Sequence, residues 1–192
     1  MKQKLLNKYQ PFKPYFKLTE RNRDKKAPYQ FAYIYKLFAY SSKLDVFLKY
    51  IIRAEAYEEC FAVKFYCSRA KHSPTPYSKV LNVFNASEVK KIIRAATEVI
   101  MLVLQIHPEA SFFYSGASTN IQGIYTEKEA NNQRYRIYKE LLKKYIAGGL
   151  FEIITYPGIS ASVFINLKSP GSVEDKERRI LSYLEEAYNF EI

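Results

Sequence analysis

The segments SFFYSG (Ser111–Gly116) and NNQRYRIY (Asn131–Tyr138) bound the most informative stretch of this chain of 192 residues. The first segment is short, aromatic and closed by glycine, which predicts a buried strand. The second opens a helix that we expect over about Asn131–Ala147, where Gly148 and Gly149 end it. With the polar loop between them, the two segments predict a strand–loop–helix crossover.

Strands are also predicted before this crossover. Tyr29–Phe38 is rich in aromatic residues with partial alternation, and Cys60–Tyr66 (CFAVKFY) alternates between two faces, so both segments favour strands. Asp45–Ala56 is compatible with a helix or a strand, and its β-branched and aromatic residues favour one arm of a hairpin. Tyr77–Phe84 is expected to form a short edge strand.

The clearest helical pattern lies between Asn85 and Pro108. Asn85 is followed three residues later by Glu88, which is the spacing of a capping box. Apolar residues then recur at helical spacing as far as Leu104, with basic and polar residues on the other side. The width of the apolar stripe predicts a central helix.

The C-terminal part is predicted to contain a hairpin and a last helix. Leu150–Tyr156 and Ser160–Leu167 flank a Pro-Gly turn, and Ser172 begins a helix within the acidic segment 172–192. Together these elements predict a single α+β domain over residues 29–192. We expect a mostly antiparallel sheet with about three helices packed on one side of it.

The net charge of +11 is concentrated toward the N-terminus. Residues 1–26 carry nine Lys or Arg against Glu20 and Asp24, whereas residues 172–192 carry three basic and six acidic side chains. Residues 1–28 also contain three prolines and no apolar period, so they cannot bury enough surface to offset the entropy of ordering. We therefore predict that residues 1–28 form a flexible basic arm.

A second basic region extends from Lys64 to Arg94. It contains seven basic residues against Glu88 alone, namely Lys64, Arg69, Lys71, Lys79, Lys90, Lys91 and Arg94. If the loop after the Cys60–Tyr66 strand lies near the outer side of the long helix, these residues form one positive patch that can bind nucleic acid or another polyanion. The alternative is that they are ordinary solvated side chains.

Arg134 and Tyr135 are the remaining candidate site residues. They lie near the start of the crossover helix, where free backbone N–H groups and an arginine can receive a phosphate or carboxylate, and Tyr135 is expected to point partly outward. Alternatively, Arg134 anchors the crossover by bonding carbonyl groups near Gly116. Arg136 is expected to pair with Glu140, four residues further on.

Signatures of catalysis, cofactors or metals are not found in the sequence. The six glycines form no phosphate loop, and Cys60, Cys67, His72 and His107 do not have zinc-site spacing. His107 precedes a proline, where a helix-end role is expected. Two cysteines placed on opposite faces of one strand predict no disulfide, and no apolar run reaches membrane-spanning length, so we expect a cytoplasmic protein.

The motifs FAVKFYC (Phe61–Cys67), HPEASFFYSGAS (His107–Ser118) and NNQRYRIY (Asn131–Tyr138) resemble a group of short uncharacterised bacterial proteins. In that group, a Pro-x-x-Ser-Phe strand ending in glycine precedes an Arg-x-Arg-[Ile/Leu/Val]-Tyr helix. The resemblance covers about residues 60–167. It implies an α+β fold and an accessory gene near mobile elements, defence systems or toxin–antitoxin pairs, and it lends no catalytic residues.

These features favour a basic interaction protein that binds nucleic acid or another polyanion. The first alternative is a protein-binding accessory module whose partner is encoded by a neighbouring gene. The second alternative is a small hydrolase or nuclease with a site that the sequence does not reveal.

Overall fold

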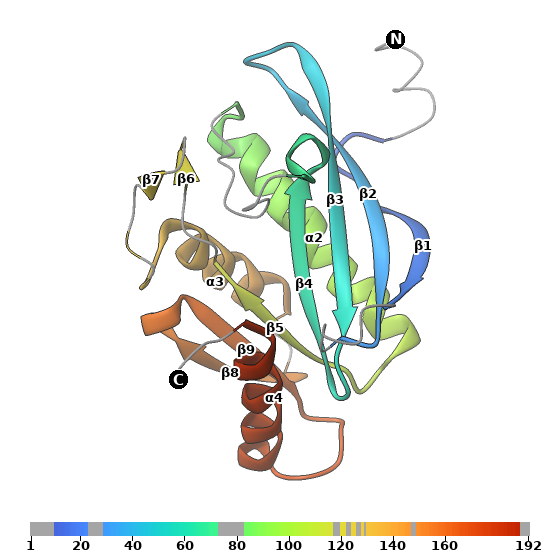
Figure 1. Ribbon diagram of the computed structural model, residues 1–192, viewed down its shortest axis with the longest axis vertical. Coiled ribbons are helices and arrows are strands. Elements are labelled where there is room, and N and C mark those ends of the chain that lie inside the picture. The colour runs from blue at the N-terminus through green and yellow to red at the C-terminus, as the bar shows by residue number, and fades with distance from the viewer. Residues whose placement is uncertain are drawn as a thin grey trace.

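A seven-stranded sheet organises the chain (Figure 1). The computed structural model describes residues 10–22, 29–72, 83–116, 120–121, 124–125, 128, 130–146 and 149–188. The strands of the sheet are β1 (Tyr15–Arg21), β2 (Phe31–Ser41), β3 (Val46–Ala56), β4 (Cys60–Cys67), β5 (Ser111–Ser115), β8 (Phe151–Tyr156) and β9 (Ala161–Asn166). Their order is β1-β2-β3-β4-β5-β9-β8, and β6 (Asn120–Ile121) pairs separately with β7 (Ile124–Tyr125).

The sheet is antiparallel except between β4 and β5. These two strands run parallel because the long helix α2 (Ala86–Ile106) carries the chain back to the edge from which β4 began. Helices α3 (Gln133–Ile146) and α4 (Val173–Tyr188) complete the α-helices of the described residues. The predicted α+β class is confirmed, and the ambiguous segment 45–56 is a strand.

Part of the predicted arm belongs to the sheet. Tyr15–Arg21 forms β1, which pairs with β2 from Tyr15 opposite Lys36 to Arg21 opposite Phe31. An edge strand is held by backbone hydrogen bonds to one neighbour and needs little apolar content, so the charge-rich sequence concealed it. The prediction of a flexible arm over the whole of 1–28 is therefore wrong for these residues, and 1–9 and 23–28 lie outside the described part. The expected edge strand at 77–84 falls largely outside it too.

Helices cover both faces of the sheet, in contrast to the predicted single side. Alternation along β9 explains why, since Phe164 packs in a cluster with α2 and α3, whereas Val163 and Ile165 pack with Ile180 and Leu184 of α4. Figure 1 shows α2 and α3 behind the sheet and α4 in front of its lower part.

The predicted capping box fixes the start of α2. The Asn85 side chain accepts a hydrogen bond from the N–H of Glu88 at 2.9 Å, and Glu88 accepts one from the N–H of Asn85 at 3.0 Å. The other carboxylate oxygen of Glu88 accepts from the N–H of Ser42 at 2.9 Å. Glu88, which caps α2, therefore also attaches this helix to the β2–β3 turn.

The two free cysteines face opposite sides of β4, as predicted, and should differ in reactivity. Cys60 is fully buried on the α4 side, whereas Cys67 is half-buried and packs against the α2 side. Burial, with the nearby charge of Glu59, raises the pKa of the Cys60 thiol to about 12. Its thiolate fraction at pH 8 should be about a thousand-fold below that of an ordinary thiol.

We therefore expect iodoacetamide to label Cys67 but not Cys60 in the native protein at pH 8, measured by peptide mass spectrometry. In denaturant, both cysteines should react at similar rates. Equal labelling of the two thiols in the folded protein would contradict the burial of Cys60.

Candidate nucleic-acid interface

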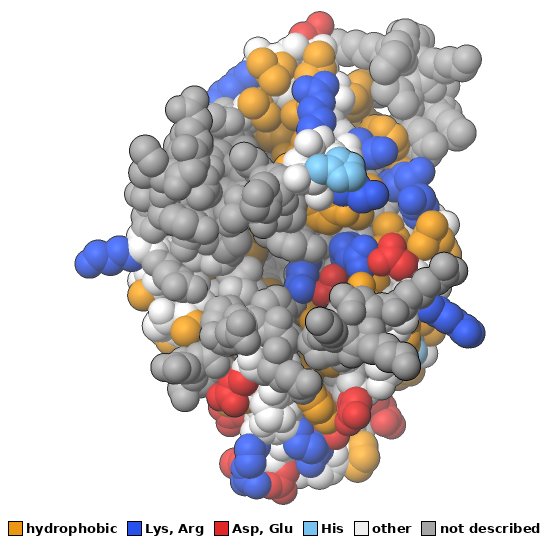
Figure 2. All heavy atoms as spheres, viewed as in Figure 1, with side chains coloured by type: hydrophobic (Ala, Val, Ile, Leu, Met, Phe, Trp, Pro, Cys, Tyr) orange, Lys and Arg blue, Asp and Glu red, His pale blue; other side chains and the backbone are white. Residues whose placement is uncertain are grey.

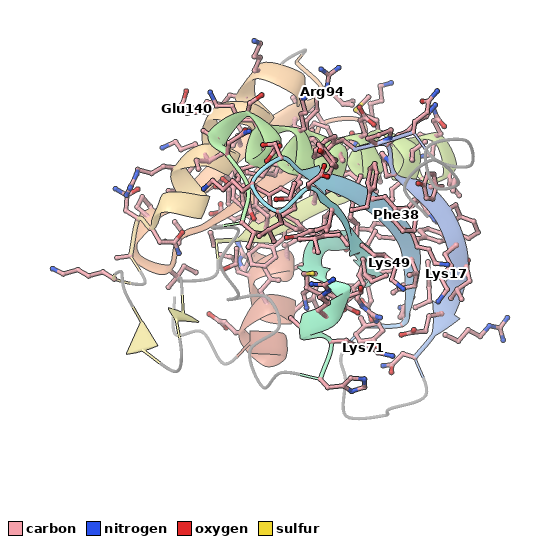
Figure 3. The ribbon with its side chains drawn as sticks, turned by 90° about the horizontal axis from the view of Figure 1, so that it is seen from above. Lys17, Phe38, Lys49, Lys71, Arg94 and Glu140 are labelled. Carbon is pink, nitrogen blue, oxygen red and sulfur yellow. The ribbon has the colours of Figure 1, made fainter. Side chains whose placement is uncertain are left out.

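The structure divides the predicted Lys64–Arg94 patch into two parts. Arg69 and Lys71 lie at η1 (Ser68–Ala70), directly after β4, and both are exposed. Figure 3 shows Lys71 on the side of the sheet away from α2, whereas Arg94 projects from the outer side of α2. The expected single patch is therefore wrong for the described residues, because the sheet separates its two ends. Lys79 lies outside the described residues.

The α2 part of the patch consists of the exposed residues Lys90, Lys91 and Arg94. Arg94 forms an exposed ion pair with Glu98 at 3.7 Å, one helical turn further on. The Lys91 ammonium lies 5.3 Å from the centre of the Phe12 ring. Arg94 and Lys91 thus have local contacts that explain them as part of a solvated helix face.

Lys64 is held in an ion-pair network. Its Nζ lies 2.7 Å from Glu55, which also contacts Arg53 at 2.9 Å, and Arg53 contacts Glu20 at 2.9 Å. The Glu55 side chain is only 5% exposed and that of Lys64 is 22% exposed. Desolvation lowers the pKa of Lys64, and the adjacent Glu55 carboxylate opposes this shift. The network joins two carboxylates to two cations, so Lys64 contributes no net charge to a ligand site.

The face of β1–β4 opposite α2 carries the other basic residues of this region. Strand register places four residues in one row across the four strands, and the next row has Phe38 directly opposite Lys49. The resulting group, which we call the open face, consists of Tyr15, Lys36, Phe38, Lys49, Ile51 and Tyr66. Figure 3 shows Phe38 and Lys49 together on this side. In the space-filling view, Lys and Arg side chains gather among apolar ones over the same side (Figure 2).

This surface is positively charged. Of the carboxylates beside it, Glu20 and Glu55 are paired within the Arg53 network, and Asp45 in the β2–β3 turn accepts a hydrogen bond from the hydroxyl of Tyr40. Among the described residues, no ion pair joins a carboxylate to the remaining cations, which are Lys36 and Lys49 on the open face and Arg69 and Lys71 at η1. The open face and η1 therefore present four positive charges together with aromatic rings.

Asn132 makes contacts of the kind expected at the start of the crossover helix. Its side-chain oxygen accepts from the N–H of Tyr135 at 2.9 Å, which is N-cap geometry, and its Nδ2 donates to the carbonyl of Gly116. The N–H of Asn132 donates to Ser160 Oγ at 2.9 Å. Asn132 thus joins β5, β9 and α3. The side chain of Arg134 lies outside the described part, so an anion-binding role for it stays a prediction.

Two other expectations about this helix are wrong. Tyr135 was expected to point partly outward, but it is 1% exposed and its ring stacks on Tyr114 with centres 6.2 Å apart. The helical periodicity of α3 places Tyr135 on the side that faces the core, so its side chain cannot contact an external anion. Arg136 donates to the carbonyl of Asn131, and the described ion pairs include none between Arg136 and Glu140.

The contacts of His107 are those of a structural residue. It is the C-cap residue of α2, and its Nε2 lies 2.9 Å from the hydroxyl of Tyr33. Its ring also packs near those of Phe31 and Phe61. Across the described ranges, His, Cys, Asp and Glu form no group of three or more that can hold a metal ion. Nor does any helix in those ranges have the length and apolar content needed to cross a membrane.

Fold and surface together define a basic α+β protein with a half-buried, aromatic and lysine-bearing sheet face. Comparison with models of known protein families, with curated proteins and with solved structures finds no match for this chain. Its side chains are therefore the basis on which a function can be assigned.

Lys36, Lys49 and Phe38 were missed as candidate site residues. Lys36 and Phe38 lie in a segment predicted as a strand from partial alternation, and Lys49 lies in the segment 45–56, which was compatible with a helix or a strand. Lys49 lies opposite Phe38, and Lys36 lies opposite Tyr15. Strand register is what places Lys36 and Lys49 on one face of the sheet.

Proposed function

We propose that this protein binds nucleic acid through the open face of β1–β4 together with Arg69 and Lys71 of η1. The observation that carries the proposal is the charge of this surface. Glu20 and Glu55 are neutralised by Arg53 and Lys64, whereas Lys36, Lys49, Arg69 and Lys71 have no ion pair with a carboxylate among the described residues. A surface of this kind attracts phosphate groups and releases their counterions on binding.

The net charge of +11 supports the same partner class, since it favours the approach of a polyanion. Aromatic rings beside the lysines favour nucleic acid over a purely anionic polymer, because a base can contact a ring while its phosphate contacts a cation.

A charge-reversal experiment tests this proposal. The variant Lys49→Glu/Lys71→Glu should weaken binding of a fluorescein-labelled oligonucleotide by about 100-fold at 100 mM salt, because it removes two phosphate contacts and adds repulsion. For the wild-type protein, four contacts predict a slope of about −3 in a plot of log K against log salt concentration. Fluorescence anisotropy measures both quantities.

The control is Lys90→Glu/Arg94→Glu, which changes the net charge by the same amount on the outer side of α2. We expect this variant to retain most of its affinity. Equal losses in the two variants would mean that diffuse charge, and not this surface, binds the ligand. The absence of binding to DNA and RNA at 20 mM salt would refute the proposed function itself.

A further inference from the structure

The aromatic rings of the open face alternate with its lysines. Phe38 of β2 lies directly opposite Lys49 of β3, and Tyr15 of β1 lies opposite Lys36 of β2. Tyr66 of β4 lies in the same row as Lys36, with Ile51 of β3 between them. Directly opposite residues in an antiparallel pair have Cβ atoms about 5 Å apart, so each lysine has a ring as its immediate neighbour.

Phe38 and Tyr66 lie on the face of the sheet away from α2. Neither residue belongs to the two hydrophobic clusters of the described residues, one on the α2 side and one on the α4 side. Both residues are half-buried, so part of each side chain reaches solvent. The Phe38 ring is tilted against the Tyr15 ring, with ring centres 6.3 Å apart and an interplanar angle of 37°.

A single strand and a duplex meet such a surface differently. The bases of a duplex are stacked on one another, so a duplex offers the open face only its phosphates. An unpaired base has a free face that can stack on an aromatic side chain, and its phosphate remains available to a lysine. Alternating rings and cations therefore match the repeating chemistry of a single strand.

We infer, building on the proposed function, that the ligand is single-stranded nucleic acid whose bases stack on Phe38 and Tyr66. Lys36 and Lys49 then contact its phosphates from the neighbouring strand positions. Stacking requires only a π face and not a particular hydrogen-bond pattern, so the surface should accept many sequences.

The test compares a 12-nucleotide single strand with the duplex of the same sequence, using anisotropy titrations of the full chain. Phe38→Leu keeps the apolar contact with Tyr15 but removes the stacking surface. We expect this variant to weaken single-strand binding roughly 5- to 100-fold and to leave duplex binding and the salt slope unchanged. Tyr66→Leu should behave in the same way. Lys49→Ala should weaken both ligands.

Phe16→Leu is the matched control, because Phe16 is 56% exposed but contacts Tyr33 and Tyr35 on the α2 side of the sheet. It should leave both affinities unchanged, and circular dichroism melting checks that each variant is folded. If Phe38→Leu and Tyr66→Leu keep the wild-type preference while Lys49→Ala weakens binding, the stacking inference fails and the proposed function stands. If no nucleic acid binds the wild-type protein, both fail.

Discussion

Replacement of Glu55 by alanine is expected to lower the free energy of unfolding by about 3–5 kcal/mol, because it breaks a buried ion pair by removing one partner. Glu55 lies within 2.9 Å of both Arg53 and Lys64, and its side chain is 5% exposed. Without it, Lys64 keeps the cost of desolvation and loses its compensating carboxylate. Urea unfolding followed by circular dichroism measures the change from the transition midpoint and slope.

Glu20→Ala is the control for this experiment. Glu20 contacts the same Arg53 at 2.9 Å, but its side chain is 45% exposed, so its removal should cost less than about 1 kcal/mol. The double variant Glu55→Ala/Lys64→Met should recover part of the lost stability, because an apolar side chain removes the unpaired buried charge. A cost for Glu55→Ala no larger than that for Glu20→Ala would show that the network is solvated and adds little.

Replacement of Gly116 by alanine should lower the free energy of unfolding by about 2–3 kcal/mol through overpacking. A Cβ atom at this position would lie 2.6 Å from Oδ1 of Asn132 and 2.7 Å and 3.0 Å from the backbone N and Cα of Tyr135. The start of α3 would have to move away from β5, and the Asn132 hydrogen bonds to Gly116 and Tyr135 would be strained with it. Thermal melting together with urea unfolding measures the loss.

Gly158→Ala provides the matched control, because a Cβ at Gly158 would meet no atom within 4 Å. It should be neutral or slightly stabilising. A second variant, Gly116→Ala/Asn132→Ala, separates the two kinds of contact. It removes the side-chain oxygen but leaves the backbone of Tyr135 in place, so the protein should stay destabilised. Wild-type stability of Gly116→Ala would show that α3 can shift without cost.

Residues that act within a few positions of one another were well predicted from the sequence. Asn85 and Glu88 form the expected capping box, and the hairpin β8–β9 forms around the Pro-Gly turn. Ser172 likewise accepts a hydrogen bond from the N–H of Asp175 at the start of α4. Their interactions depend on spacing along the chain, which the sequence displays directly.

Long-range placement could not be predicted in the same way. Whether Lys71 and Arg94 share a surface depends on which side of the sheet α2 occupies, and no local pattern records that choice. The crossover shows the same limit, since Asn132 contacts Gly116 and Ser160, which lie 16 and 28 residues away. The segment NNQRYRIY contains the asparagine that caps α3, but the prediction assigned the anchoring role to Arg134 because of its charge.

The sequence by itself thus determined the α+β class, the capped central helix and the basic character of the chain, because alternation, capping and composition are properties of neighbouring residues. The tertiary structure decided which charges are available. It paired Lys64 with Glu55, buried Tyr135, and aligned Lys36, Phe38 and Lys49 on one face. The physical reason is that strand register and sheet order set the distances between side chains that are far apart in the sequence.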